Sequence, residues 1–196
     1  MIDQNEKSSK LSTFIREYRP EIKFVLTFGI ILVAGFFFIH NKTVGKHLIQ
    51  PITEVETYIA SFLLNHVVGF PNEQTGLYIA GKEGNSFRMQ VLNTCNGIFE
   101  SLIFLAAFIA IQVPWKRKIG WMIFGFLFFH FVNEMRLVSL FVVGSNYSTK
   151  AFVFFHETFW NYAIVIVSLA TFIFCANQVS KKSPTMKAAS QASEPD

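Results

Sequence analysis

Charged residues are scarce in this chain, because Asp, Glu, Lys and Arg make up only 15% of its 196 residues. A typical soluble domain carries about 25% charged residues. The scarcity argues against a soluble globular enzyme and favours a protein that crosses a membrane several times.

Cysteine, proline and glycine are also few. Two Cys, Cys95 and Cys175, are too few for a disulfide framework. Six Pro and eleven Gly fit neither a disordered chain nor a fibrous repeat. We see no metal-binding constellation, glycine-rich phosphate loop or nucleic-acid patch, so we expect no cofactor, no metal and no nucleic-acid partner.

Apolar residues are abundant instead: 52% of the chain is hydrophobic, and Phe alone occurs 24 times. Four apolar runs are long enough to predict membrane spans. They cover residues 22–39, 96–113, 119–143 and 151–174. The domain prediction is a cytoplasmic segment at 1–21, a membrane-embedded domain at 22–176 and a disordered cytoplasmic tail at 177–196.

The longest polar stretch lies between the first two spans, at residues 40–95. Apolar residues recur at helical spacing over 52–70, which predicts an amphipathic helix lying on the membrane or against the bundle. The segments GLYIAG and FRMQVLN flank the turn-prone KEGNS and predict a short, solvent-exposed β-hairpin. The expected fold class is an all-α polytopic membrane protein of about four transmembrane helices, with this extracytoplasmic helix and hairpin added.

Basic residues predict the orientation. The net charge is +4, and in a membrane protein an excess of Lys and Arg marks the cytoplasmic loops. If both termini are cytoplasmic, most of the basic residues fall inside, including the run Lys116, Arg117 and Lys118. The expected location is therefore the cytoplasmic (inner) membrane, with membrane lipid as a partner.

Ionisable residues inside the predicted spans need an explanation, since each costs roughly 2.5–3.5 kcal/mol on insertion scales. They are Glu100, His130, Glu134, Arg136, His156 and Glu157. With a rise of about 1.5 Å per residue, Arg136 and His156 lie roughly 12 and 8 Å below the outer ends of their spans. Cys95 opens the second span at a similar level. Asn133 and Arg136 are three residues apart and share one helix face.

These residue types suit nucleophilic catalysis. A thiolate is a strong nucleophile, a His can move the proton, and an Arg can stabilise an oxyanion or the thiolate. A helix N-terminus also favours the thiolate.

Each residue also has a plainer interpretation. Cys95 could be a small buried hydrophobe, as we expect for Cys175, and His156 could be a hydrogen-bond partner between helices. His130 could bond to Glu134 one turn away. Arg136 could form a structural ion pair with Glu100, Glu134 or Glu157, which would fit a non-catalytic membrane assembly factor.

Three motifs together resemble the exosortase/archaeosortase family, and most closely exosortase H. They are Cys95-Asn96-Gly97 at the start of one span, Asn133-Glu134-Met135-Arg136 in the next span, and His156 in the last. The resemblance covers about residues 45–178.

The resemblance implies a membrane-embedded cysteine peptidase or transpeptidase with Cys95 as nucleophile, His156 as acid and base, Arg136 as transition-state stabiliser and Asn133 in support. Its implied partners are secreted proteins whose C-terminal sorting signal comprises a short motif, a hydrophobic helix and a basic tail. Cleavage at the outer face of the membrane would pass through a thioester on Cys95, which water or an unknown acceptor would resolve. Glu134 and Glu157 are additions beside the matched motifs.

Overall fold

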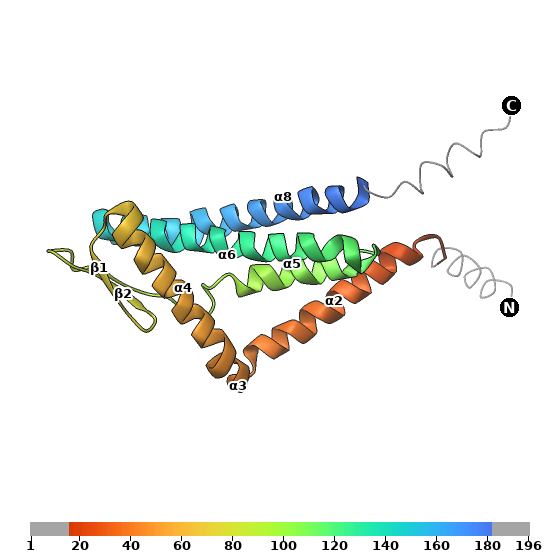
Figure 1. Cartoon of the computed structure of the whole chain (residues 1–196), viewed down its shortest axis with the longest axis horizontal. Helices are drawn as coiled ribbons and strands as arrows, with labels where there is room; N and C mark the ends of the chain where they lie inside the picture. Colours follow the sequence, from red (N-terminus) through yellow and green to blue (C-terminus); the bar gives the residue numbers. More distant parts are fainter. Residues whose placement is uncertain (1–15, 182–196) are drawn as a thin grey trace, which may run out of the picture.

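The computed structural model describes residues 16–181, and within this range the protein is an elongated bundle of helices with a small sheet at one end (Figure 1). The helices and strands follow in this order: α2 (Arg19–His40), α3 (Lys42–Val44), the π-helical turn η1 (Gly45–Ile49), α4 (Gln50–Leu63), the π-helical turn η2 (Leu64–Val68), β1 (Asn72–Thr75), β2 (Tyr78–Gly81), β3 (Arg88–Gln90), α5 (Ile98–Ala110), α6 (Trp115–Asn146), α7 (Thr149–Phe154), the π-helical turn η3 (Phe155–Phe159) and α8 (Trp160–Lys181).

Three helical segments of the described range are long and apolar enough to cross a membrane: α2, α6, and the continuous segment Thr149–Lys181. They match three of the four predicted spans. The span predicted at 96–113 corresponds to α5, a shorter apolar helix of 13 residues. At about 1.5 Å per residue it is roughly 20 Å long, below the ≈ 30 Å hydrocarbon thickness of a typical bilayer.

Local sequence explains where these helices begin and end. Pro20 occupies the first turn of α2, where its missing N–H is tolerated. The extended backbone of Asn41 ends that helix, and the Asn41 side chain starts α3 by accepting a hydrogen bond from the backbone N–H of Thr43. The Ser148 hydroxyl accepts from the N–H of Ala151 and starts the final helical segment. The same segment runs to Lys181, so the first residues of the tail predicted at 177–196 are helical; the rest of that tail and residues 1–15 lie outside the described residues.

The predicted hairpin supplies two strands, β2 and β3, of a three-stranded antiparallel sheet of order β1-β2-β3. Tyr78 pairs with both Thr75 and Gln90, which fixes the register on its two sides. The sheet is not wholly solvent-exposed as predicted, because Ile79 and Met89 are buried against α4 and α6.

The buried core forms two clusters along the bundle. One joins the sheet, α4 and the C-terminal half of α6, around Leu64, Ile79 and Phe141. The other joins α5, α6 and α8 around Phe108, Phe129 and Cys175. The stretch of α6 from Phe129 to Leu137 connects the clusters, and the candidate site lies along it.

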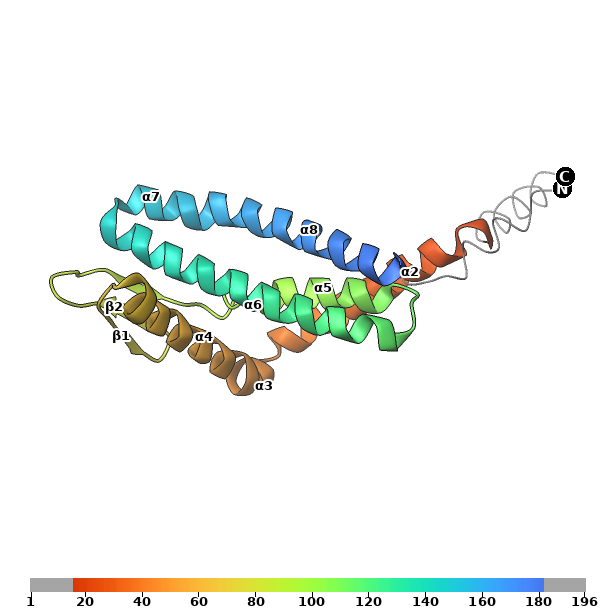
Figure 2. The same ribbon diagram turned by 45° about the horizontal axis from the view of Figure 1, so that its top comes forward.

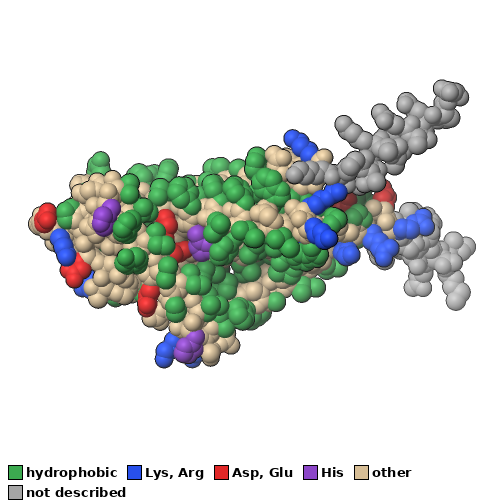
Figure 3. All heavy atoms as spheres, viewed as in Figure 1, with side chains coloured by type: hydrophobic (Ala, Val, Ile, Leu, Met, Phe, Trp, Pro, Cys, Tyr) green, Lys and Arg blue, Asp and Glu red, His purple; other side chains and the backbone are tan. Residues whose placement is uncertain are grey.

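The two ends of the bundle differ in the elements and in the side chains that they carry. The start of α2 and the end of α8 lie at the same end, while α4, the sheet and α7 lie at the other (Figure 2). Basic side chains gather at the end where α2 begins, and apolar side chains cover most of the surface between the two ends (Figure 3).

Candidate active site

The Cys95-Asn96-Gly97 triplet forms a turn that leads into α5. Cys95 is half-buried, and Asn96 is fully buried. Gly97 has a left-handed φ of 69° at the N-cap of α5. A Cβ placed on it would lie 3.2 Å from the Cβ of Asn133, so this glycine permits both the turn and the close approach to α6.

Arg136 comes from the middle of α6 and is 6% exposed. Its Nη2 lies 4.0 Å from the Cys95 Sγ. The backbone carbonyl of Arg136 accepts from the Ser139 hydroxyl at 2.9 Å, and that hydroxyl accepts from the Trp160 indole at 2.9 Å. This chain of hydrogen bonds connects the arginine-bearing turn of α6 to the first residue of α8.

His156 lies in the π-helical turn η3, between α7 and α8. Its Nε2 is 3.9 Å from the Cys95 Sγ. The imidazole is parallel to the Phe152 ring, with an interplanar angle of 8° and a centroid distance of 5.9 Å. Single π-helical turns inside α-helices occur frequently at functional sites.

The structure therefore brings together the thiol, guanidinium and imidazole singled out in the sequence. Both contacts are at the long end of hydrogen bonding to sulfur, which is common for catalytic groups without bound substrate. Asn133 shares a helix face with Arg136, but its side chain bonds to Glu56 rather than to the thiol. Cys175 is a buried core residue far along the bundle, packed with Phe108 and Phe129.

Arg136 has no carboxylate partner within residues 16–181, because the ion pairs formed there are Lys82–Glu73 and His130–Glu56. The guanidinium Nε is buried without a hydrogen-bond partner in this part of the chain. The structural ion pair considered from the sequence is thus absent from the described residues. Both carboxyl oxygens of Glu134 are buried and unpartnered there, and Glu157 is exposed.

Glu56 is the polar residue that the sequence-based search for site residues missed. It is 4% exposed, and its carboxyl bonds to the His130 Nδ1 and, at 3.0 Å, to the Asn133 Nδ2. The prediction that His130 bonds to Glu134 is wrong, because Glu56 on α4 takes that place. Burial raises the pKa of Glu56, and the interactions with His130 and Asn133 oppose this rise.

An apolar groove of about 610 Å³ lies between α5 and α8. Its lining includes Phe99 and Glu100 in the first turn of α5, and Asn161 about one turn after His156. It continues along the two helices to Ala107 and Phe172. One end of the groove therefore lies close in sequence to both Cys95 and His156. In residues 16–181 no three His, Cys, Asp or Glu side chains gather so that they could hold a metal ion.

A comparison with protein families gives a match. Neither the curated proteins nor the solved structures contain a match to this chain. The description of the matching family is transmembrane exosortase, and the match covers residues 21–174. That range includes all three motifs and every helix of the bundle except the first two residues of α2 and the last seven of α8. The chain belongs to the transmembrane exosortase family.

Proposed function

We propose that this protein is a membrane-embedded cysteine peptidase or transpeptidase that cleaves C-terminal sorting signals of secreted proteins at the outer face of the cytoplasmic membrane. Family membership supports a processing role of the exosortase type in a membrane. One observation carries the catalytic assignment: the Cys95 Sγ lies 3.9 Å from the His156 Nε2 and 4.0 Å from the Arg136 Nη2.

In the first step, His156 takes the thiol proton and the Cys95 thiolate attacks the carbonyl carbon of the scissile peptide bond. The carbonyl oxygen becomes an oxyanion, which the buried Arg136 guanidinium stabilises. The C–N bond then breaks, and His156 returns the proton to the leaving amine. The product that remains on the enzyme is a thioester.

In the second step, water or an amine attacks the thioester carbonyl carbon. His156 accepts a proton from this nucleophile, and Arg136 again faces the oxyanion. The C–S bond breaks, the thiolate leaves and takes back the proton from His156. Water gives hydrolysis, whereas an amine acceptor gives transpeptidation.

The groove between α5 and α8 supports this substrate class. A hydrophobic helix could lie along its apolar walls, with the residue to be cleaved close to Cys95. The basic tail of such a signal would extend towards the end of the bundle where α2 begins. In the proposed orientation the end where α2 begins is cytoplasmic, and Cys95 lies near the outer surface. The basic side chains at the α2 end agree with this orientation, because Lys and Arg mark the cytoplasmic side of membrane proteins (Figure 3).

The test is co-expression with a secreted reporter that carries a motif, a hydrophobic helix and a basic tail, chosen from the proteins of the source genome that share such an ending. Wild type should shorten the reporter, and Cys95→Ala and Cys95→Ser should abolish shortening at normal membrane abundance. Cys175→Ala is the matched control and should process the reporter as wild type does.

The intermediate supplies a second, independent readout. The reporter fragment should be isolated on Cys95 in a complex that neutral hydroxylamine releases, as expected for a thioester. Processing by Cys95→Ala at the wild-type rate would contradict the assignment of the nucleophile.

A further inference from the structure

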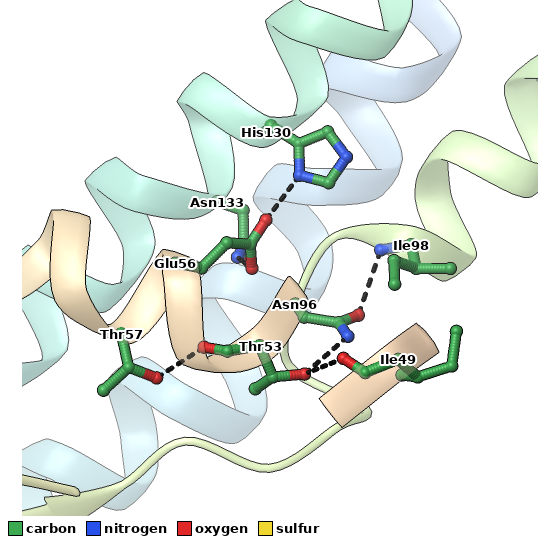
Figure 4. Close-up of polar contacts among 8 residues, drawn as sticks. All are labelled: Ile49, Thr53, Glu56, Thr57, Asn96, Ile98, His130 and Asn133. Carbon is green, nitrogen blue, oxygen red and sulfur yellow. Dashed lines mark hydrogen bonds and ion pairs between the residues drawn. The ribbon is translucent and has the colours of Figure 1, made fainter. Parts of the chain in front are cut away.

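The amphipathic helix α4 turns polar side chains towards the bundle. Thr53, Glu56, Thr57 and Ser61 are buried, whereas Val55, Tyr58, Ile59 and Phe62 are exposed. Thr53 and Glu56 are three residues apart, so they lie on one face within a single helical turn. Figure 4 shows these two side chains pointing to different partners, one in the turn before α5 and one on α6.

Thr53 contacts the residue next to the candidate nucleophile. The Asn96 Nδ2 donates to the Thr53 Oγ1 at 2.9 Å, and both residues are fully buried. The Asn96 Oδ1 accepts from the backbone N–H of Ile98 at 3.2 Å, which closes the turn that leads into α5. Asn96 is thus fixed on two sides, and the backbone of Cys95 is fixed with it.

Glu56 contacts the turn of α6 that carries Arg136. Its Oε2 accepts from the Asn133 Nδ2, and its Oε1 bonds to the His130 Nδ1 (Figure 4). Asn133 lies one turn before Arg136 on the same face of α6, and it is also the residue that Gly97 approaches. The carboxyl therefore bonds to a side chain that belongs to the arginine-bearing helix and lies close to the cysteine-bearing turn.

We propose that Glu56 is a positioning residue, and that α4, through Thr53 and Glu56, sets the spacing between the Cys95 thiol and the Arg136 guanidinium. The proposal rests on the proposed function for its catalytic consequence. Burying a carboxyl is unfavourable unless its oxygens are bonded, and here both oxygens have partners. Glutamine keeps the size of the side chain but carries one donor and one acceptor, so its amide nitrogen needs His130 in the other tautomer or the Asn133 amide turned over, and it cannot form a charge-assisted hydrogen bond to either partner.

The test uses the full chain in nanodiscs on a Cys175→Ala background, so that Cys95 is the single thiol. Glu56→Gln is compared with Glu54→Gln, which removes the same charge from the same helix. The Glu54 carboxyl bonds to Gln50 one turn away along α4, with no link to the site. The readouts are the rate of Cys95 alkylation by iodoacetamide at neutral pH, and kcat and KM for the reporter.

We expect Glu56→Gln to slow alkylation about 10-fold, because a guanidinium displaced from its position 4.0 Å from the sulfur stabilises the thiolate less. We expect kcat to fall about 10- to 100-fold with KM unchanged, as for a misplacement of up to about 1 Å. Glu54→Gln should match wild type in both readouts. Unchanged alkylation and kcat in Glu56→Gln would overturn the proposal.

A second pair of variants decides the matter if Glu56→Gln does not fold. Thr53 and Thr57 are both buried, and each donates to a backbone carbonyl of its own helical segment, at Ile49 and Thr53 respectively. Thr53 alone also accepts from Asn96. Thr53→Val should slow alkylation and lower kcat, and Thr57→Val should not; equal effects would overturn the proposal.

The two readouts separate this proposal from the proposed function. Slower alkylation in Glu56→Gln and Thr53→Val, with no processing by wild type, supports the positioning role and contradicts the proposed reaction. Normal alkylation in both variants, with processing that depends on Cys95, overturns the positioning role and supports the reaction.

Discussion

Replacing Gly97 by Ala should separate the geometry of the candidate site from the stability of the fold. Gly97 has a φ of 69°, in the left-handed region where an L-residue costs about 1–2 kcal/mol. The added Cβ would also lie 3.2 Å from the Cβ of Asn133 and 3.7 Å from the Phe129 carbonyl oxygen. A 3.2 Å approach forces a displacement of a few tenths of an ångström between α6 and the turn that bears Cys95.

A second glycine with a left-handed φ provides a matched control for the backbone strain. Gly69 has a φ of 72°, and a Cβ placed on it meets nothing within 4 Å. Gly69→Ala should therefore carry the same strain of about 1–2 kcal/mol without moving a neighbour. Both variants should lower Tm. Gly97→Ala alone should also lower kcat by about 10-fold, because the thiol already lies 4.0 Å from Arg136 and 3.9 Å from His156, and a further displacement would break these contacts.

The assay is reporter processing by purified protein, with Tm measured in the same detergent and kcat referred to the folded fraction. The reasoning would be refuted if Gly69→Ala and Gly97→Ala lost equal amounts of kcat, or if Gly97→Ala kept wild-type kcat despite a lower Tm.

Three further predictions concern other buried charges. Arg136→Lys should retain membrane abundance, since Arg136 has no ion-pair partner in the described residues. It should lower kcat at least about 10-fold, because an ammonium group lacks the planar, forked donors of a guanidinium. Low abundance with normal specific activity would contradict this prediction. Lys118→Met should lower the unfolding free energy by about 2 kcal/mol, because the Lys118 Nζ donates to three carbonyls at the C-terminal end of α5. The variant should show a lower Tm with an unchanged kcat. An unchanged Tm would contradict this prediction. Burial raises the pKa of Glu56, so ionising it costs folding free energy as the pH rises from the ordinary value of 4.5 through the raised one. The Tm of wild type minus that of Glu56→Gln should therefore fall over this pH range, and a constant difference would refute the assigned shift.

The position of α4 could be predicted from sequence, but not which face of the helix points towards the bundle. In water, the apolar stripe of an amphipathic helix turns inward. Beside a membrane the surroundings are as apolar as the core, so burying that stripe gains little. Hydrogen bonds to Asn96, Asn133 and His130 therefore turn the polar face of α4 towards the bundle. The apolar stripe of α4 that contains Val55 and Phe62 faces outward.

The same reason explains which site residues were found. Charges inside apolar runs are conspicuous, so Arg136 and His156 could be identified from sequence alone. Glu56 is inconspicuous because it lies in a polar stretch among other polar residues, and only the pairing across α4 and α6 reveals its burial. Strand β1 was missed because its residues, Asn72–Thr75, are all polar and show no alternation. It is defined by pairing with β2 and by the Asn72 amide, which donates to the carbonyls of Phe70 and Ser61.

The π-helical turn at Phe155–Phe159 changes the angular phase of everything N-terminal to it relative to α8. An α-helix turns through about 100° per residue, so one extra residue in a turn rotates the preceding side chains around the axis by about that amount. A helical wheel drawn continuously from α8 therefore misplaces His156 by up to about 100° around the helix axis. Any design that straightens this segment or transplants it onto a regular helix must include the same phase correction, or the imidazole will point away from sulfur.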